Sequence, residues 1–89
     1  MKNKEATVVN CRADDYDVYI GRGSKWGNPF AMRGKSEAER NRVCDAYEAW
    51  FMNQPSLVND LHELKGKVLG CYCTPKRCHG DFLARGANK

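Results

Sequence analysis

Thiol and imidazole side chains gather near the C-terminus, and they are the residues of this sequence best suited to chemistry. The stretch GCYCTPKRCHGD, residues 70–81, holds three of the five cysteines and one of the two histidines. Thiolates and imidazole are good zinc ligands, and four of them complete a tetrahedral structural site. The spacing, Cys-x-Cys followed by an adjacent Cys-His, differs from that of the common zinc knuckles, so zinc is one of several interpretations. The candidate metal ligands are Cys71, Cys73, Cys78 and His79.

The same cluster has the residue types of a reactive or ligand-binding site. A cysteine near a helix N-terminus has a lowered pKa, because backbone N–H groups there stabilise the thiolate. Asp81 is a candidate N-cap, which places Cys78 close to a helix start. Cys71 or Cys78 is then a candidate nucleophile, with His79 as its acid or base. Such a helix start also binds phosphate, with Lys76 and Arg77 closing on it, so Arg77 is a candidate ligand contact. Asp81 is a candidate contact in the floor of the same site, together with the cysteines and His79.

Packing is the third interpretation of the cysteines. Free cysteines are often buried and fill protein cores as small apolar groups. We expect that role for Cys11, on a strand, and for Cys44, within a helix. The spacing between Cys73 and Cys78 matches no recognised redox motif. In the ligand-binding interpretation, Cys73 is a candidate ligand contact.

A glycine-rich loop, YIGRGSKWGNPF at residues 19–30, is the second unusual stretch. Its glycine pattern is not the dinucleotide-binding fingerprint. Arginine and lysine bind phosphate, tryptophan stacks on a base or sugar, and asparagine reads a polar edge. The alternative is a loop attached to the core by Trp26 and Phe30, with its basic residues in solvent. The candidate ligand contacts of this loop are Arg22, Ser24, Lys25, Trp26 and Asn28.

The elements that must position these residues follow from periodicity and capping signals. The first two expected strands are rich in β-formers and can form a hairpin. Ser36 and Glu39 match a capping box, and the apolar residues that follow recur at helical spacing. Ser56 and Asp81 are candidate caps of two later helices. The expected elements are strands at 6–11 and 16–22, helices at 36–52 and 56–65, a strand at 67–73 and a helix at 82–85.

Length and composition describe one small folded domain with no predicted membrane segment. The chain has 89 residues, of which 42% are hydrophobic, and its net charge is +4. No apolar run approaches the roughly 20 residues that span a bilayer, and the N-terminus has no signal-peptide core. We therefore expect a cytoplasmic location, where thiols stay reduced, and an odd number of five cysteines does not indicate a disulfide framework. The ends, 1–6 and 86–89, are expected to fray.

The two unusual stretches together resemble a known family. The segments VVN-R, DVYIGRGSKWGNPF and GKVLGCYCTPKRCHGDFLA, with an amphipathic helix before the last, resemble domain of unknown function 4326. That family consists of small proteins of bacteria and bacteriophages, and the resemblance runs from about Val8 to Ala84. The ending is more loosely similar to domain of unknown function 488, where a glutamate stands in the place of Cys73. This second likeness favours a ligand-binding or active site over structural zinc, and neither family name implies a reaction.

These observations predict a single α/β, or compact α+β, domain with the element order β-β-α-α-β-α and one site where the third strand ends. If the strands that precede the two unusual loops are parallel or adjacent, both loops leave at one edge of the sheet. The expected ligand is anionic, such as a nucleotide, a modified base or a nucleic-acid end. One alternative is a zinc-stapled nucleic-acid-binding module. The other is a factor that binds a host protein through an apolar patch around Trp50 and Phe51.

Overall fold

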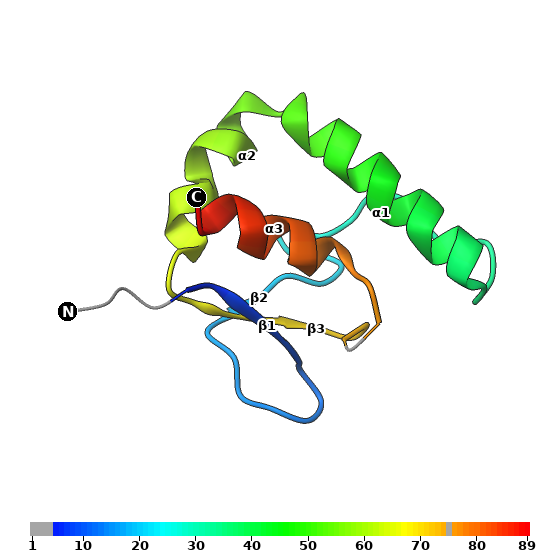
Figure 1. Ribbon diagram of the computed structural model, residues 1–89, viewed down its shortest axis with the longest axis horizontal. Coiled ribbons are helices and arrows are strands. Elements are labelled where there is room, and N and C mark those ends of the chain that lie inside the picture. Colours follow the sequence, from blue (N-terminus) through cyan, green and yellow to red (C-terminus); the bar gives the residue numbers. More distant parts are fainter. Residues whose placement is uncertain (1–4, 75) are drawn as a thin grey trace.

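A three-stranded parallel sheet forms the centre of the molecule (Figure 1). The computed structural model describes residues 5–74 and 76–89. The strands are β1 (Thr7–Asn10), β2 (Val18–Tyr19) and β3 (Val68–Cys71). Their order is β1-β3-β2, and the central strand β3 pairs in parallel with both neighbours.

The first two strands do not form the predicted hairpin, because β3 lies between them. Two hydrogen bonds between Asp17 and Val68 support this pairing. Its backbone N–H donates to the Val68 carbonyl oxygen at 2.7 Å, and its Oδ2 accepts from the Val68 N–H at 2.8 Å. Both bonds direct the start of β2 to the start of β3, and a long-range contact of this kind leaves no pattern in the local sequence.

The helices follow the predicted order, so the chain has the α/β architecture β-β-α-α-β-α. Ser36 caps the first helix as predicted, since its hydroxyl accepts from the Glu39 N–H at 3.1 Å. The second helix begins two residues earlier than predicted, because its N-cap is Gln54 instead of Ser56 and its first residue is Pro55. The elements are α1 (Glu37–Met52), α2 (Pro55–Asp60), the 3-10 helix η1 (Leu61–Leu64) and α3 (His79–Ala87).

The segment between β3 and α3 differs from the prediction at both ends. β3 ends at Cys71, so Cys73 belongs to the loop. The N-cap of α3 is Cys78, not Asp81. Asp81 instead occupies the third helical position, where its Oδ2 accepts from the Cys78 N–H at 3.2 Å. The expectations for residues 1–4 and for Pro75 lie outside the described residues.

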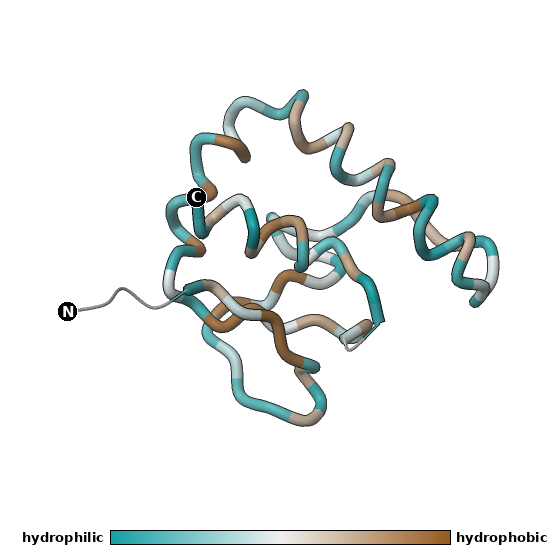
Figure 2. The backbone as a smooth tube through the Cα atoms, viewed as in Figure 1, coloured by the Kyte–Doolittle hydropathy of each residue, from teal (hydrophilic) through white to brown (hydrophobic). Residues whose placement is uncertain are grey.

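The core lies between the sheet and the helices, which cover one face of the sheet (Figure 1). Ile20, Leu69 and Leu83 are fully buried there, together with Tyr47 and Phe51 of α1. The tube coloured by hydropathy shows the matching apolar stretches along the strands and along the inner side of α3 (Figure 2). None of the helices in the described part of the chain is long and apolar enough to cross a membrane.

Close packing of α3 on the sheet depends on Gly80. A Cβ atom at this position would lie 2.7 Å from Ile20 Cδ1 and 3.2 Å from Val8 Cγ1, both of which belong to the sheet side of the core. Only glycine therefore lets the first turn of α3 approach the strands this closely. The packing places both His79 and the N-cap Cys78 against the carboxyl ends of the strands.

Candidate functional site

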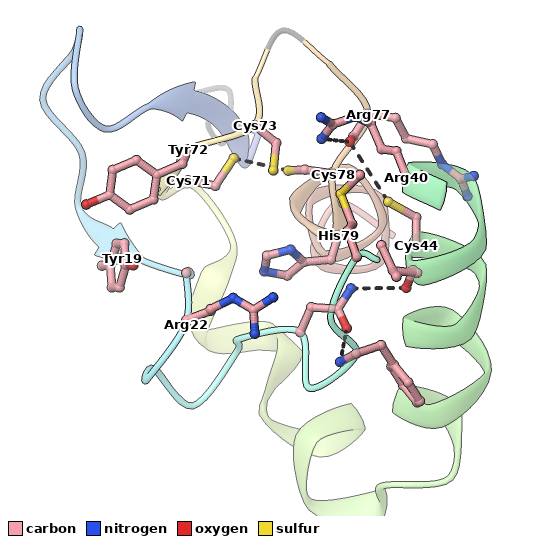
Figure 3. Close-up of a pocket in the computed structure, with 15 residues that line it drawn as sticks. Tyr19, Arg22, Arg40, Cys44, Cys71, Tyr72, Cys73, Arg77, Cys78 and His79 are labelled. Atoms are coloured by element: carbon pink, nitrogen blue, oxygen red, sulfur yellow. Dashed lines mark hydrogen bonds between the residues drawn. The ribbon is translucent and has the colours of Figure 1, made fainter. Parts of the chain in front are cut away.

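A cavity of about 230 Å³ lies where β2 and β3 end. Because these strands are parallel, the loop after β2 and the loop after β3 leave at the same edge of the sheet, as the sequence predicts. Helix α1 closes the opposite side, so the cavity has walls from three parts of the chain (Figure 3). Its apolar and aromatic lining residues are Tyr19, Phe30, Met32, Val43 and Tyr72.

Two sulfur atoms are in direct contact at the floor of this cavity. Cys71 Sγ lies 3.1 Å from Cys78 Sγ, and both residues are buried. Cys71 ends β3, and Cys78 caps α3, so the contact joins the two elements on either side of the 72–77 loop. The Gly80 N–H donates to Cys78 Sγ at 3.2 Å, and the Thr74 hydroxyl lies 3.4 Å from Cys71 Sγ. Each sulfur therefore has one further polar contact besides the other sulfur.

The two thiols have opposite pKa shifts. The hydrogen bond from the Cys78 thiol lowers the pKa of Cys71 to about 5, and the Thr74 hydroxyl acts in the same direction. The pKa of Cys78 is raised, because it holds the proton that Cys71 accepts and because it is buried. The Gly80 N–H at the helix start lowers the pKa of Cys78, as expected, but the contact with Cys71 and burial outweigh this effect. The contact thus favours the charged form at Cys71 and the protonated form at Cys78, as in a pair that shares one proton.

His79 lies beside the thiol pair with a defined protonation state. Its Nε2 is 2.6 Å from the Ile20 carbonyl oxygen. Because a carbonyl can only accept, Nε2 carries the proton in the neutral ring, and the lone pair is on Nδ1. Burial lowers the pKa of His79, so the neutral ring predominates at neutral pH. The ring also packs edge-on against Tyr47, with the ring centroids 4.9 Å apart.

The predicted metal ligands do not converge as a set of four. Within the ranges 5–74 and 76–89, no group of three or more His, Cys, Asp or Glu side chains lies close enough together to hold a metal ion. Cys71 and Cys78 touch, but the Nε2 atom of His79 is turned to the Ile20 carbonyl. Cys73 is half buried and lines the cavity. The arrangement does not fit the tetrahedral donor set that structural zinc requires.

Basic side chains surround one end of the cavity. A second cleft of about 360 Å³ is lined by Lys35, Glu37, Arg40, Lys76 and Arg77. Arg40 and Arg77 also line the first cavity, so the two spaces are neighbours.

The basic side chains differ in whether an acid neutralises them. Arg77 forms ion pairs with Asp45 at 2.8 Å and with Glu48 at 3.0 Å. The other cations that line the two spaces form no ion pair within 4.0 Å among the described residues. They are Arg22, Lys35, Arg40 and Lys76. This edge of the molecule therefore carries positive charge that the protein itself does not neutralise.

Two of the five candidate residues of the glycine-rich loop line the cavity, namely Arg22 and Asn28. The Arg22 side chain extends toward the space below His79 (Figure 3). Asn28 has a structural role in addition, because its Nδ2 donates to the Val43 carbonyl at 3.0 Å and its Oδ1 accepts from the Phe30 N–H at 2.8 Å. The first of these bonds attaches the loop to α1, and the second lies within the loop.

The other three candidates of this loop lie elsewhere. Trp26 is buried and stacks on Phe51, with ring centroids 6.2 Å apart. Lys25 extends to Asp60, with Nζ and Oδ2 2.7 Å apart. The Ser24 hydroxyl donates to the carbonyl of Gly21 inside the loop. For these residues the structure corresponds to the alternative in which Trp26 attaches the loop to the core.

Sequence reasoning did not identify the α1 side of the cavity. Arg40, Val43 and Cys44 lie on successive turns of one face of α1 and line it. Cys44 is buried, as expected, and its thiol faces the Arg77 carbonyl at 3.9 Å. The signal was present, because positions 40, 43 and 44 follow the same helical spacing as the core face. Phe51 is fully buried and Trp50 is half buried, which agrees with the predicted apolar face of this helix and not with the alternative of an exposed patch around these two residues.

Comparisons with known proteins identify two viral relatives and a family. The chain is 36% identical over 86 residues to an uncharacterized 12.4 kDa protein in the nrdA-td intergenic region of Enterobacteria phage T4, covering 92% of this chain and 77% of that protein. It is also 36% identical over 100 residues to uncharacterized protein R718 of Acanthamoeba polyphaga mimivirus, covering 92% and 71% of the two chains. No solved structure matches it significantly. Residues 3–89 match the family described as Domain of unknown function (DUF4326), and the chain belongs to that family.

Proposed function

We propose that the domain binds one nucleotide unit of an anionic ligand, either a free nucleotide or part of a nucleic acid. The main support for this proposal is the position of Arg40. Arg40 lines both the cavity that contains the thiol pair and the basic cleft beside it. A ligand that occupies both spaces passes this guanidinium. Arginine is well suited to phosphate, because its planar N–H groups can form two parallel hydrogen bonds.

The cavity supports the base or sugar part of such a ligand. Tyr19, Phe30 and Tyr72 contribute aromatic rings to its walls, and aromatic rings stack on nucleobases. Its volume of about 230 Å³ is below the roughly 300–1,000 Å³ of sites for drug-sized ligands, which favours a single ring system as occupant. The Asn28 side chain and His79 supply polar edges nearby.

The basic cleft supports the phosphate part. Arg40, Lys35 and Lys76 line it, and each is free of ion pairs among the described residues. One acid, Glu37, also lines the cleft, so the cations outnumber the acids there. Phosphate binding to such a site releases counterions and weakens as salt concentration rises.

The floor of the cavity adds groups that can act on a bound ligand. Cys71 is the candidate nucleophile, because it holds the negative charge of the thiol pair. Cys78 is the weaker candidate, because it retains the proton. His79 is a candidate acid or base through Nδ1, since its Nε2 is occupied by the Ile20 carbonyl.

Calorimetric titration of the protein with nucleoside 5′-monophosphates and with short single-stranded oligonucleotides tests the binding proposal. We expect Arg40→Gln to weaken binding about tenfold or more, which corresponds to the loss of one charge-assisted hydrogen bond. Arg42→Gln is the matched control, because Arg42 lies on the same helix, pairs with Glu39 and lines neither space. Equal effects of the two substitutions, or the absence of binding in the unaltered protein at low salt, would contradict the proposal.

A further inference from the structure

We propose that Cys71 and Cys78 are a peroxide-reactive thiol pair whose oxidised form is a disulfide between the end of β3 and the start of α3. This inference goes beyond ligand binding and rests on the contact between the two sulfur atoms. They lie 3.1 Å apart, and a disulfide bond is about 2.05 Å long. An approach of about one ångström therefore converts the contact into a bond.

The surroundings assign different roles to the two sulfurs. Cys71 is the attacking residue, because its sulfur contacts both the Cys78 sulfur at 3.1 Å and the Thr74 hydroxyl at 3.4 Å, and these contacts lower its pKa. Cys78 is the resolving residue, because it already faces Cys71 and keeps its proton until the second step. A thiolate beside a resolving cysteine is the usual arrangement of a cysteine that senses oxidants.

The chemistry takes place in two steps. The Cys71 thiolate attacks one oxygen of hydrogen peroxide, the O–O bond breaks, and Cys71 becomes a sulfenic acid while hydroxide leaves. The Cys78 thiol then attacks the Cys71 sulfur, the S–S bond forms, and the sulfenic oxygen leaves as water with the Cys78 proton. The two sulfurs together supply two electrons to the peroxide. A dithiol reductant returns the pair to its starting state.

Access favours a small oxidant. Cys71 and Cys78 are 1% and 3% exposed, so a protein disulfide cannot reach them at the surface. Both residues line the cavity of about 230 Å³, and a space of roughly 10–15 Å³ already holds a water molecule. Hydrogen peroxide is little larger than water and can therefore enter.

The other cysteines are placed differently. Among the described residues, Cys71 and Cys78 are the one pair whose sulfur atoms are in hydrogen-bond contact. Cys44 directs its thiol to the Arg77 carbonyl. Cys11 follows β1 and does not line the cavity. Selective oxidation of Cys71 and Cys78 is the outcome that this arrangement predicts.

The test exposes the folded, fully reduced protein to hydrogen peroxide in the presence of a chelator, followed by alkylation and peptide mapping by mass spectrometry. We expect an early loss of two hydrogens per chain, a crosslink between the peptides of Cys71 and Cys78, and its reversal by dithiothreitol. A crosslink that contains Cys73, or oxidation of Cys11 before the pair, would overturn the proposal. No ligand is added, so the result is independent of the nucleotide proposal.

Variants separate the two roles. In Cys78→Ser, oxidation should stop at a Cys71 sulfenic acid that dimedone labels, and in Cys71→Ser the early oxidation should be lost. Cys11→Ser is the control, and it should form the crosslink at the rate of the unaltered protein. Circular dichroism of each variant shows whether it is folded. If a variant is unfolded, the crosslink in the unaltered protein still shows whether Cys71 and Cys78 form a disulfide. Dimedone labelling of Cys78 in Cys71→Ser at the normal rate would reverse the assigned roles and overturn the proposal.

Discussion

The imidazole of His79 and the backbone of Ile20 are joined by a hydrogen bond of 2.6 Å from Nε2 to the carbonyl oxygen. The bond connects the first residue of α3 to the residue that follows β2. It is buried, and it holds the glycine-rich loop against the helix that carries Cys78. The geometry of the cavity therefore depends on a group that can titrate.

Acidification should destabilise the protein through His79. Its pKa in the folded state is lowered from 6.5 by burial, while the unfolded chain keeps the ordinary value. The unfolded state therefore binds the proton more readily, and stability falls as pH decreases through 6.5 to the folded-state pKa. Tyr47, the Ile20 carbonyl, Cys71 and Asp81 face the ring or act on it, and burial outweighs the charges. The slope should approach about 1.4 kcal/mol per pH unit within that window.

Denaturant unfolding at about pH 7.5 and about pH 5.5 measures this loss. His79→Gln is the informative comparison, because glutamine can donate to the Ile20 carbonyl but does not titrate in this range. The variant should lose less stability on acidification than the unaltered protein. The same pH dependence in both proteins would assign the effect to other groups.

A methyl group at position 80 should be costly. The added Cβ of Gly80→Ala would meet Ile20 Cδ1 at 2.7 Å and Cys78 Sγ at 3.1 Å, so α3 must move away from the sheet. We expect a loss of about 1–3 kcal/mol in the free energy of unfolding, as in other overpacked cores.

Gly34→Ala is the control for this substitution, because nothing lies within 4 Å of a Cβ at that position. Its φ is outside the left-handed region, so alanine should be neutral or slightly stabilising. Urea unfolding curves of the two variants compare them directly, and equal midpoints would contradict the close packing of α3.

Removal of one hydroxyl should loosen the glycine-rich loop. Tyr47 is fully buried, and its hydroxyl donates to the Trp26 carbonyl at 2.8 Å. Tyr47→Phe leaves that carbonyl without this partner, which should cost about 1–3 kcal/mol of stability. Tyr72→Phe is the matched control, since Tyr72 is 54% exposed, and its midpoint of thermal unfolding should change little. An unchanged free energy of unfolding in Tyr47→Phe would mean that the Trp26 carbonyl finds another partner, and it would contradict this prediction.

The negative charge on Cys71 should oppose the proposed anionic ligand. Cys71→Ser replaces the thiolate with a neutral hydroxyl, so the affinity for a nucleoside monophosphate should rise. The rise should be no more than a few-fold, because the proposed phosphate lies in the neighbouring cleft, which Cys71 does not line, and the interaction between two charges falls with their distance. Calorimetric titration under reducing conditions measures the change, and Cys11→Ser serves as the control outside the cavity. Weaker binding by Cys71→Ser would instead assign the thiolate a direct role in holding the ligand.

The order of elements could be predicted because its signals are local. Ser36 has the right chemistry for an N-cap, and Val43, Tyr47 and Phe51 have the spacing of a buried helix face. The pairing of β2 could not be predicted, because it depends on contacts between Asp17 and Val68, which are 51 positions apart. A tight loop between two β-rich segments favours a hairpin until that contact is known.

The site could be predicted only in part. The common edge of the two loops followed from the element order once the strands were parallel. The orientation of loop side chains did not, because Trp26 suits a ligand platform and a core equally well, and here it packs on Phe51. Cysteine is not among the preferred N-cap residues, so Asp81 was the better candidate on propensity alone. The thiol contact that results from Cys78 in the cap has no local signal.

Asn88 ties the two ends of the described chain together. Its Oδ1 accepts from the Ala6 N–H at 2.6 Å, and its Nδ2 donates to the Ala6 carbonyl at 3.2 Å. These two residues thus meet where β1 begins. The cavity lies where β2 and β3 end, which is the other end of the parallel sheet. Figure 1 shows β1 beside β3. A domain with adjoining ends can be circularly permuted or grafted into a loop of another protein. The cavity would then lie at the end of the sheet away from the point of attachment. The domain could therefore be inserted into another protein with its cavity still accessible.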